Sequence, residues 1–133
     1  MNKELMKLEG QRRFRRLIES HGGVLSTDEV ASLLNITPSA VKELHNKNKL
    51  ISFLREGTHY FPAWQFKGSA ILPQLQEVMD ALGKDRTDYA KIRFFLTHDK
   101  SLNGMNRIEA LSYEKNIISI IEKAKTFDLQ DPT

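Results

Sequence analysis

The sequence predicts a mainly α-helical fold with a small β-hairpin wing, in which a helix-turn-helix module is followed by a helical C-terminal module. Three observations predict it. Apolar residues recur at helical spacing through most of the 133 residues. Two helix-start signals, at Ser26 and Thr37, lie close together in the chain. The segment 50–61 is rich in strand-forming side chains and is interrupted by Glu56-Gly57, which is a turn signal.

Composition predicts a folded protein without membrane contact. Hydrophobic residues make up 40% and charged residues 28%, which is enough apolar side chain for an ordinary core. No apolar run approaches the roughly 18 residues that a membrane span needs, and the N-terminus lacks the apolar block of a signal peptide. Cysteine is absent, so disulfides, thiolate metal sites and cysteine nucleophiles are excluded. We therefore expect a cytoplasmic protein.

Charge is distributed unevenly along the chain. Residues 1–67 hold 11 Lys and Arg against 7 Asp and Glu, a balance of +4, whereas residues 68–133 hold 9 against 10, a balance of −1, which together give the net +3. A local positive surplus is what attraction to phosphate groups requires. The N-terminal half is therefore the better candidate for contact with a nucleic acid.

The first predicted element is a helix over residues 3–20. Phe14, Leu17 and Ile18 fall near one face of it, and Gly22-Gly23 ends it with residues that tolerate positive φ. The arginine-rich run at 11–16 fits either phosphate contacts or a solvated basic face, and the second interpretation is favoured.

A helix-turn-helix is predicted over residues 26–49. Ser26 and Glu29 form a capping box for a helix that ends near residue 34, Asn35 supplies a turn residue that accepts positive φ, and Thr37-Pro38 begins a second helix. Ala31 is the small residue expected where the two helices cross. Apolar side chains are expected to fill the wedge between them: Val30, Leu34, Ile36, Val41 and Leu44.

Beyond this pair, strands are expected at 50–55 and 58–61, and a short helical turn at 63–66. A further helix is expected from about Gly68 to Leu82. Helical patterns continue at 87–96, 107–111 and 114–125, with a core made by Phe94, Leu102, Ile108 and Leu111. We place a domain boundary at 67/68. Residues 1–67 then form the N-terminal helix and winged module, and residues 68–133 form a helical module for partner binding or dimerisation.

The outward face of the second helix, 38–47, carries side chains that suit DNA. Asn can bond adenine, Lys can bond guanine or phosphate, Ser can contact either, and Glu can accept from the cytosine amine. Residues near the hairpin can contact the flanking backbone. The expected DNA-binding residues are Ser39, Lys42, Glu43, Asn46 and Lys47 on the helix, and Lys49, Arg55 and His59 on or beside the hairpin.

Residues 24–66 resemble the winged helix-turn-helix of the MerR and excisionase group. The resemblance lies in the segment from 25–31 through Leu50-Ile51, then in Gly57 and in 60–66. In that group the two helices and the following hairpin form the DNA-binding unit. The resemblance therefore implies sequence-directed binding to double-stranded DNA, with the helix 38–47 in the major groove.

Residues 87–127 resemble, over 90–98 and 102–111, the C-terminal domain of Xre-type antitoxins that pair with RES-fold toxins. That domain has a Trp-Leu pair, a Leu-x-Gly turn and a Ser-Pro before a short apolar helix. Here Phe95-Leu96 replaces the first pair and Asn106-Arg107 replaces Ser-Pro, while Ser112-Tyr113 stands where a glycine is expected. The resemblance implies a cognate toxin as a possible partner of this segment.

Nothing in the sequence forms a catalytic site. The four histidines, at 21, 45, 59 and 98, lack the spacing of a helical metal site, and Gly22-Gly23 lacks the residues that complete a phosphate-binding loop. No serine stands in a nucleophile elbow. We expect no enzyme activity, no catalytic residues, no bound metal and no cofactor.

Two functions fit these patterns. The first is a transcription regulator, such as an antitoxin-like repressor, that binds DNA as a homodimer because one short recognition helix buries too little surface for tight specific binding. The alternative is a protein–protein adaptor on a helix-turn-helix scaffold without DNA binding. The sequence pI of about 9.2 favours the first.

Overall fold

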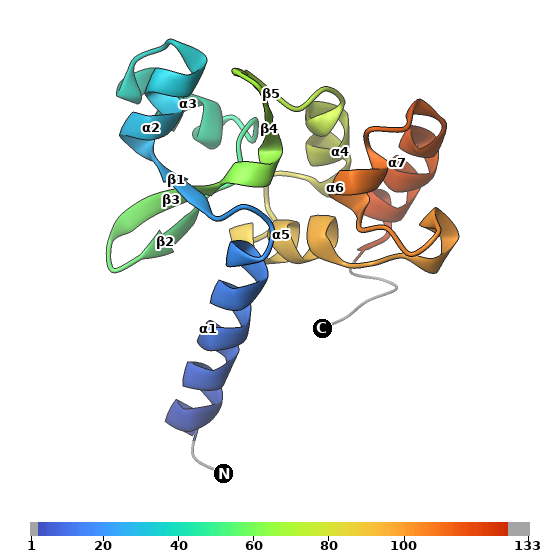
Figure 1. Cartoon of the computed structure of the whole chain (residues 1–133), viewed down its shortest axis with the longest axis horizontal. Coiled ribbons are helices and arrows are strands. Elements are labelled where there is room, and N and C mark those ends of the chain that lie inside the picture. Colours follow the sequence, from blue (N-terminus) through green and yellow to red (C-terminus); the bar gives the residue numbers. More distant parts are fainter. Residues whose placement is uncertain (1–2, 128–133) are drawn as a thin grey trace.

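The computed structural model describes residues 3–127, and the side chains of residues 9–10 and 12–127. The chain is mainly helical with a small three-stranded antiparallel sheet, which confirms the predicted fold class. In Figure 1 the C-terminal end of the helix α1 meets the rest of the molecule, and the N-terminal end of α1 projects away from it. No helix in this part of the chain is long and apolar enough to cross a membrane.

The N-terminal half combines three helices with the sheet. Its helices and strands, in chain order, are α1 (Lys3–Glu19), β1 (Val24–Ser26), α2 (Thr27–Leu34), α3 (Pro38–Asn46), β2 (Phe53–Arg55) and β3 (Thr58–Pro62). A 3-10 turn, η1 (Ala63–Gln65), follows the sheet. These bounds agree closely with those predicted for the helix-turn-helix and for the second strand of the hairpin, whereas the first strand begins at Phe53, three residues later than expected.

The sheet has the order β1-β3-β2, with both pairings antiparallel. Its hairpin turns at Glu56 and Gly57, whose φ angles of 53° and 80° are those of a type I′ turn. Strand β1 adds a third strand that was not predicted: Leu25 pairs with Phe61. Residues 24–26 are too short for an alternating pattern, so only pairing with β3 reveals them as a strand.

The helix predicted from Gly68 to Leu82 is wrong in its first half. The chain instead makes a second small hairpin, β4 (Phe66–Lys67) and β5 (Ala70–Ile71), and α4 runs only over Leu75–Leu82. Gly68 has φ 62° and Gln74 has φ 67°, both left-handed. Pro73 has no amide hydrogen to donate, so a helix cannot run through it without losing a hydrogen bond.

The C-terminal half is helical, as predicted. It contains α5 (Asp88–Leu96), η2 (Lys100–Leu102), α6 (Arg107–Ala110), η3 (Glu114–Asn116) and α7 (Ile117–Lys125). Thr87 caps α5, and Asn106 begins α6 with a capping box to Glu109. Of the four predicted core residues, three are buried and Ile108 is partly buried against them.

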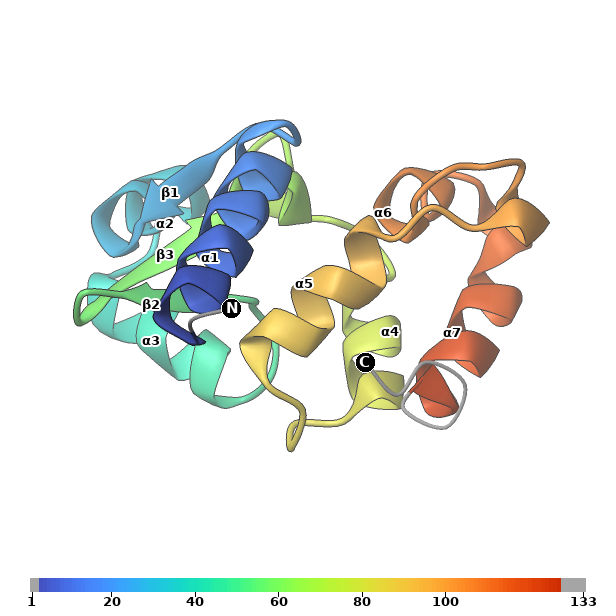
Figure 2. The same cartoon turned by 90° about the horizontal axis from the view of Figure 1, so that it is seen from below.

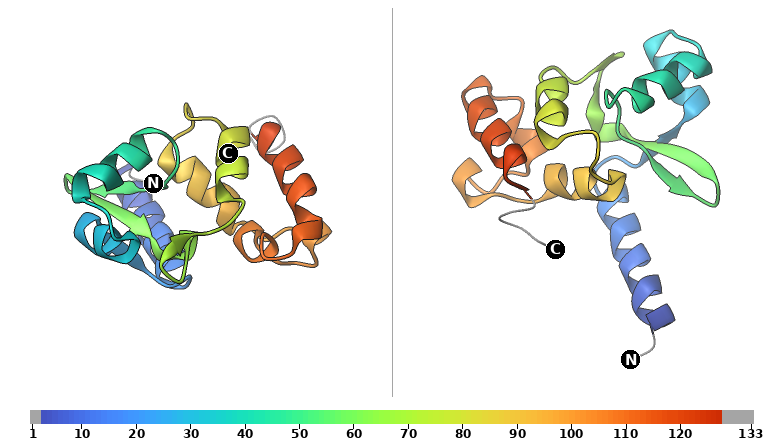
Figure 3. Two further views of the ribbon diagram at one scale, coloured as in Figure 1. Left: turned by 90° about the horizontal axis from the view of Figure 1, so that it is seen from above. Right: turned by 180° about the vertical axis from the view of Figure 1, so that it is seen from behind.

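Two hydrophobic clusters form the core of the described residues. The smaller one lies between α2, α3 and the sheet and contains Val30, Ala31, Val41, Leu50 and Phe61. The larger one joins Ile18, Ile51 and Phe53 to the apolar side chains of α4, α5 and α7. Figures 2 and 3 show α5 between the sheet-bearing half and α7. The larger cluster therefore includes residues on both sides of position 67, and the domain boundary stays a prediction.

Candidate nucleic-acid interface

Local hydrogen bonds fix where α2 and α3 begin. The Glu29 amide donates to the Ser26 hydroxyl at 3.1 Å, and the Ser26 amide donates to the Glu29 carboxylate at 2.8 Å, as the predicted capping box requires. The Ala40 amide donates to the Thr37 hydroxyl at 3.1 Å. Between the helices Asn35 has φ 57° and ψ 48°, which is the left-handed turn conformation predicted for it.

Apolar packing decides which face of α3 is turned outward. Val30 and Val41 are fully buried between the two helices, and Ala31 is buried beside them. Leu34, Ile36 and Leu44 are partly buried against the same cluster, as predicted. With its apolar side chains held against α2, α3 presents the opposite, polar face to solvent.

Ala31→Leu is expected to lower the free energy of unfolding by about 1–3 kcal/mol, because the larger side chain overpacks the crossing of α2 and α3. Urea denaturation of parent and variant measures the difference. Ser32→Leu is the matched control, since Ser32 is exposed on the same helix and its replacement should change stability by less than about 0.5 kcal/mol. An Ala31→Leu variant as stable as the parent would show that the helices do not pack closely at this residue.

The five residues predicted on α3 are all exposed: Ser39, Lys42, Glu43, Asn46 and Lys47. Glu43 and Lys47 form an ion pair of 2.9 Å one turn apart. The hydrogen bond from Lys47 lowers the pKa of the Glu43 carboxyl. The pair reduces the repulsion between Glu43 and a phosphate. Lys42 is then the lysine on this face that forms no ion pair among the described residues.

The hairpin residues fall into two places. Lys42 and Asn46 line a hollow of about 230 Å³ together with Thr27, His45 and His59, so the structure brings His59 next to α3. Arg55 instead lines a hollow on the α1 side of the hairpin, where its guanidinium lies over the Phe53 and Tyr60 rings at 5.5 and 5.7 Å. Lys49 is exposed just after α3.

A buried hydroxyl joins α3 to the hairpin, and the sequence did not reveal it. The Ser52 hydroxyl lies 3.0 Å from Nε2 of His45 on α3 and 3.1 Å from Nδ1 of His59 on β3. His45 Nε2 also lies 3.4 Å from the carboxylate of Asp88 on α5. Because Ser52 is fully buried and the serine and aspartate approach the same nitrogen, this cluster positions α3 and is not a nucleophilic triad.

The C-terminal end of α3 is held by a second buried polar network. Asn48 has φ 62° and donates to the Met79 carbonyl at 2.9 Å, while it accepts from Lys91 Nζ at 2.6 Å. Burial lowers the pKa of Lys91, against the opposing effect of Asp88. The contact fixes the end of α3 against α4 and α5.

The comparisons identify a structural neighbour but no family. No protein-family model matches the sequence, and no curated protein matches it significantly. Among solved structures, the NMR structure of Rv2175c is similar, with a TM-score of 0.67 and 20% sequence identity over 78% of this chain and 80% of that one. At this identity the similarity shows the fold alone.

Within the described residues, no group of three or more His, Cys, Asp or Glu side chains is arranged to hold a metal ion. The histidine pair at α3 and the hairpin has a serine between its ring nitrogens and a single carboxylate beside it.

Proposed function

We propose that this chain binds double-stranded DNA through α3 and acts as a transcription regulator. The observation that carries the proposal is the orientation of α3: its apolar residues pack on α2, and its polar residues are exposed beside the β2–β3 hairpin. A helix of this kind fits the major groove, which admits an α-helix and presents a distinct pattern for each base pair. The resemblance to the MerR and excisionase winged helix-turn-helix supports the same mode.

In this mode Lys42, near the middle of α3, and Asn46, its last residue, read bases or hold phosphates. Asn46 can pair with an adenine edge and Lys42 with guanine or phosphate, while Ser39 lies at the start of the helix. Lys49 and His59 contact the flanking backbone. The guanidinium of Arg55 lies on the α1 side of the hairpin. Arg55 therefore contacts the DNA only if the DNA backbone also passes along that side.

We propose a homodimer on DNA, since two copies of α3 about one helical turn of DNA apart, roughly 34 Å, give the contact area that one copy lacks. The C-terminal helices are the proposed site for a protein partner. Tyr113 and Ile118 support this, because they are large apolar side chains that are 53% and 77% exposed. We also propose that the protein acts in the cytoplasm.

Lys42→Ala and Asn46→Ala are each expected to weaken duplex binding by about 1–3 kcal/mol if the side chain contacts a base, and to leave folding intact because both are exposed. The duplex is first selected from a random pool with the parent protein. Fluorescence anisotropy over a salt series then measures affinity, and its dependence on salt reports the phosphate contacts. Lys84→Ala, an exposed lysine between α4 and α5, is the matched control and should bind like the parent.

Two results would contradict the proposal. Unchanged affinity in both variants would remove α3 as the reading element. If the parent selects no duplex even at low salt, it does not bind DNA, and the adaptor function takes its place. The second result concerns the function as a whole, whereas the first concerns only which helix carries it.

A further inference from the structure

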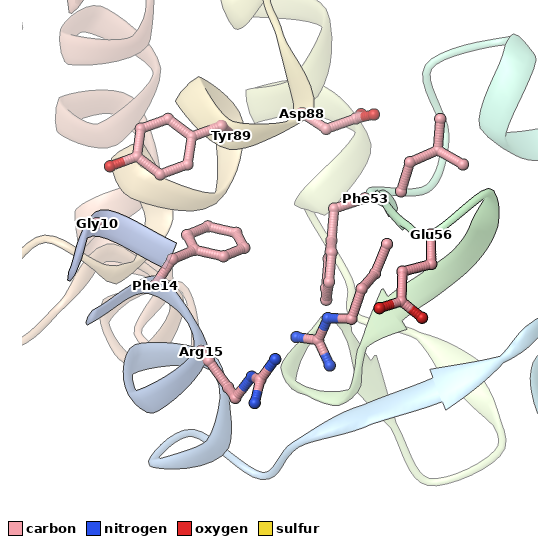
Figure 4. A pocket seen from close by; sticks show the side chains of 9 residues that line it. Gly10, Phe14, Arg15, Phe53, Glu56, Asp88 and Tyr89 are labelled. Atoms are coloured by element: carbon pink, nitrogen blue, oxygen red, sulfur yellow. The ribbon is translucent and has the colours of Figure 1, made fainter. Parts of the chain in front are cut away.

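A groove separate from the polar face of α3 lies between α1, the β2–β3 hairpin and the start of α5. Its volume is about 760 Å³, which is in the range of small-molecule sites. Figure 4 shows its lining: the rings of Phe14 and Tyr89 on one side, Phe53 across from them, and Arg15 reaching in from α1. Three separate parts of the chain therefore contribute to one concave surface.

The walls of the groove are aromatic. The Phe14 ring meets Phe53 edge-on with centroids 5.5 Å apart, and it lies 5.0 Å from the Tyr89 ring at an angle of 42°. Tyr89 is 54% exposed and Leu54, which also lines the groove, is 62% exposed. These are large apolar surfaces left facing water, and a flat aromatic molecule can cover them by edge-to-face and offset contacts.

Two arginines without an ion-pair partner line the groove. Arg15 and Arg55 take part in no ion pair among the residues whose side chains are described. Two carboxylates, Asp88 and Glu56, also line it, so the formal charges of its lining balance, and Asp88 lies 3.4 Å from His45 Nε2. Because Arg15 and Arg55 are not paired with these carboxylates, their guanidinium groups can bind a ligand that carries a carboxylate.

Gly10 leaves one wall of the groove open. It lies within α1 and lines the groove, and a Cβ added to it would meet nothing within 4 Å. A helix with glycine at an interior position is less stable than the same helix with alanine by about 1 kcal/mol, and no close contact requires a glycine at this position. The consequence of the missing side chain is open space in the groove wall.

We propose that this groove binds a small aromatic carboxylate. The carboxylate pairs with Arg15 and Arg55, and the ring system lies among Phe14, Phe53 and Tyr89. Because the ligand touches α1 and the hairpin at once, its binding holds these two elements together next to the DNA-binding unit. It therefore changes duplex affinity. This last consequence rests on the proposed function, whereas ligand binding does not.

The test is a calorimetric titration of the full chain with 2-naphthoate, without DNA. We expect saturable binding of one molecule per chain, and binding at least about tenfold weaker for the neutral analogue 2-naphthamide. Arg15→Gln, which removes the charge of an exposed side chain, should weaken the binding of 2-naphthoate at least about tenfold. Gly10→Phe should do the same by filling the groove. Arg16→Gln, at an exposed arginine of α1 that does not line the groove, is the matched control and should bind like the parent. Thermal melting verifies that the variants fold.

Several results would overturn the proposal. These are no saturation up to about 1 mM, equal affinity for the acid and the amide, or unchanged affinity in Arg15→Gln. If the parent is a dimer that does not bind 2-naphthoate and Gly10→Phe makes it monomeric, the groove belongs to a second copy of the chain. If the protein binds 2-naphthoate but selects no duplex, the ligand site is supported and the proposed function is contradicted. If it selects a duplex but does not bind 2-naphthoate, the proposed function is supported and the ligand site is contradicted.

Discussion

Gln65→Leu is expected to lower the free energy of unfolding by about 2–5 kcal/mol. The Gln65 side chain is fully buried. It accepts from the Ile51 amide at 2.8 Å, and it donates to the Ile51 carbonyl at 2.8 Å and the Pro62 carbonyl at 3.0 Å. Leucine fills similar space but leaves these backbone groups unpaired, and each unpaired buried group costs about 1–3 kcal/mol.

The position of Gln65 gives this loss a structural consequence. Ile51 lies between α3 and β2, and Pro62 ends β3, so the amide fixes the hairpin relative to the preceding helix. Urea denaturation measures the stability, and amide hydrogen exchange at Ile51 measures whether its hydrogen bond is lost. We expect faster exchange at Ile51 in the variant.

Gln76→Leu is the matched control. Gln76 is only partly buried and its hydrogen bonds, to Asp80 at 2.7 Å and to the Asn48 carbonyl at 3.5 Å, lie where water can replace it. The same substitution there should cost less than about 1 kcal/mol. Equal effects at the two positions would mean that the Gln65 network does not hold the hairpin in place.

What the sequence predicted well is what local chemistry decides. Ser26 and Thr37 mark the starts of α2 and α3 because a hydroxyl reaches an amide only three residues away. Asn35 marks the turn because few residues other than glycine tolerate positive φ. The spacing of the apolar residues then identified the buried face of α3. The residues on the opposite face were therefore expected to be exposed and to form the candidate interface.

What the sequence did not predict depends on contacts between distant residues. Ser52 has two histidine neighbours, each seven positions away, and Asn48 meets Lys91 from 43 positions away. A single sequence has no periodic signal for such pairs. The helix expected at 68–82 failed for a different reason: apolar spacing was followed through Pro73, whose missing amide hydrogen and fixed φ outweigh it.

The residues of the candidate interface also divide into those that the sequence could place and those that it could not. The α3 residues lie together because they share one helix, so helical spacing was sufficient to find them. Arg55 and His59 sit on neighbouring strands of one hairpin yet line different hollows. Successive side chains of a strand point to opposite faces, so position in the hairpin could not show which residues accompany α3.

Asp99→Ala is expected to lower the free energy of unfolding by about 2–4 kcal/mol at neutral pH. The Asp99 carboxylate, 9% exposed, accepts from the Ser101 amide at 2.9 Å and pairs with Arg107 at 3.3 Å and with Lys123 on α7. It therefore links the loop after α5 to α6 and α7. Removing it leaves positive charges in a partly buried site without their shared carboxylate, and thermal and urea denaturation measure the loss.

The pH dependence of this loss distinguishes the charge of Asp99 from its packing. Burial alone would raise the pKa of the Asp99 carboxyl, but hydrogen bonds from Lys123 and Ser101 outweigh it and hold the pKa far below its ordinary value. The folded-state pKa thus lies below the unfolded value of about 4, so the ionised carboxylate stabilises the fold fully above that pH. This stabilisation is lost as pH falls through the depressed folded pKa.

We therefore expect the stability gap between the parent and Asp99→Asn, which keeps the size but not the charge, to be constant above about pH 5 and to narrow as pH falls below about 4. Asp85→Ala, an exposed aspartate in the loop before α5, is the control and should change stability by less than about 0.5 kcal/mol. A gap that stays constant down to about pH 2 would show that the ion pairs with Arg107 and Lys123 add nothing to stability. In that case the packing of α6 and α7 on Phe94 and Leu102 would hold this half of the fold without them.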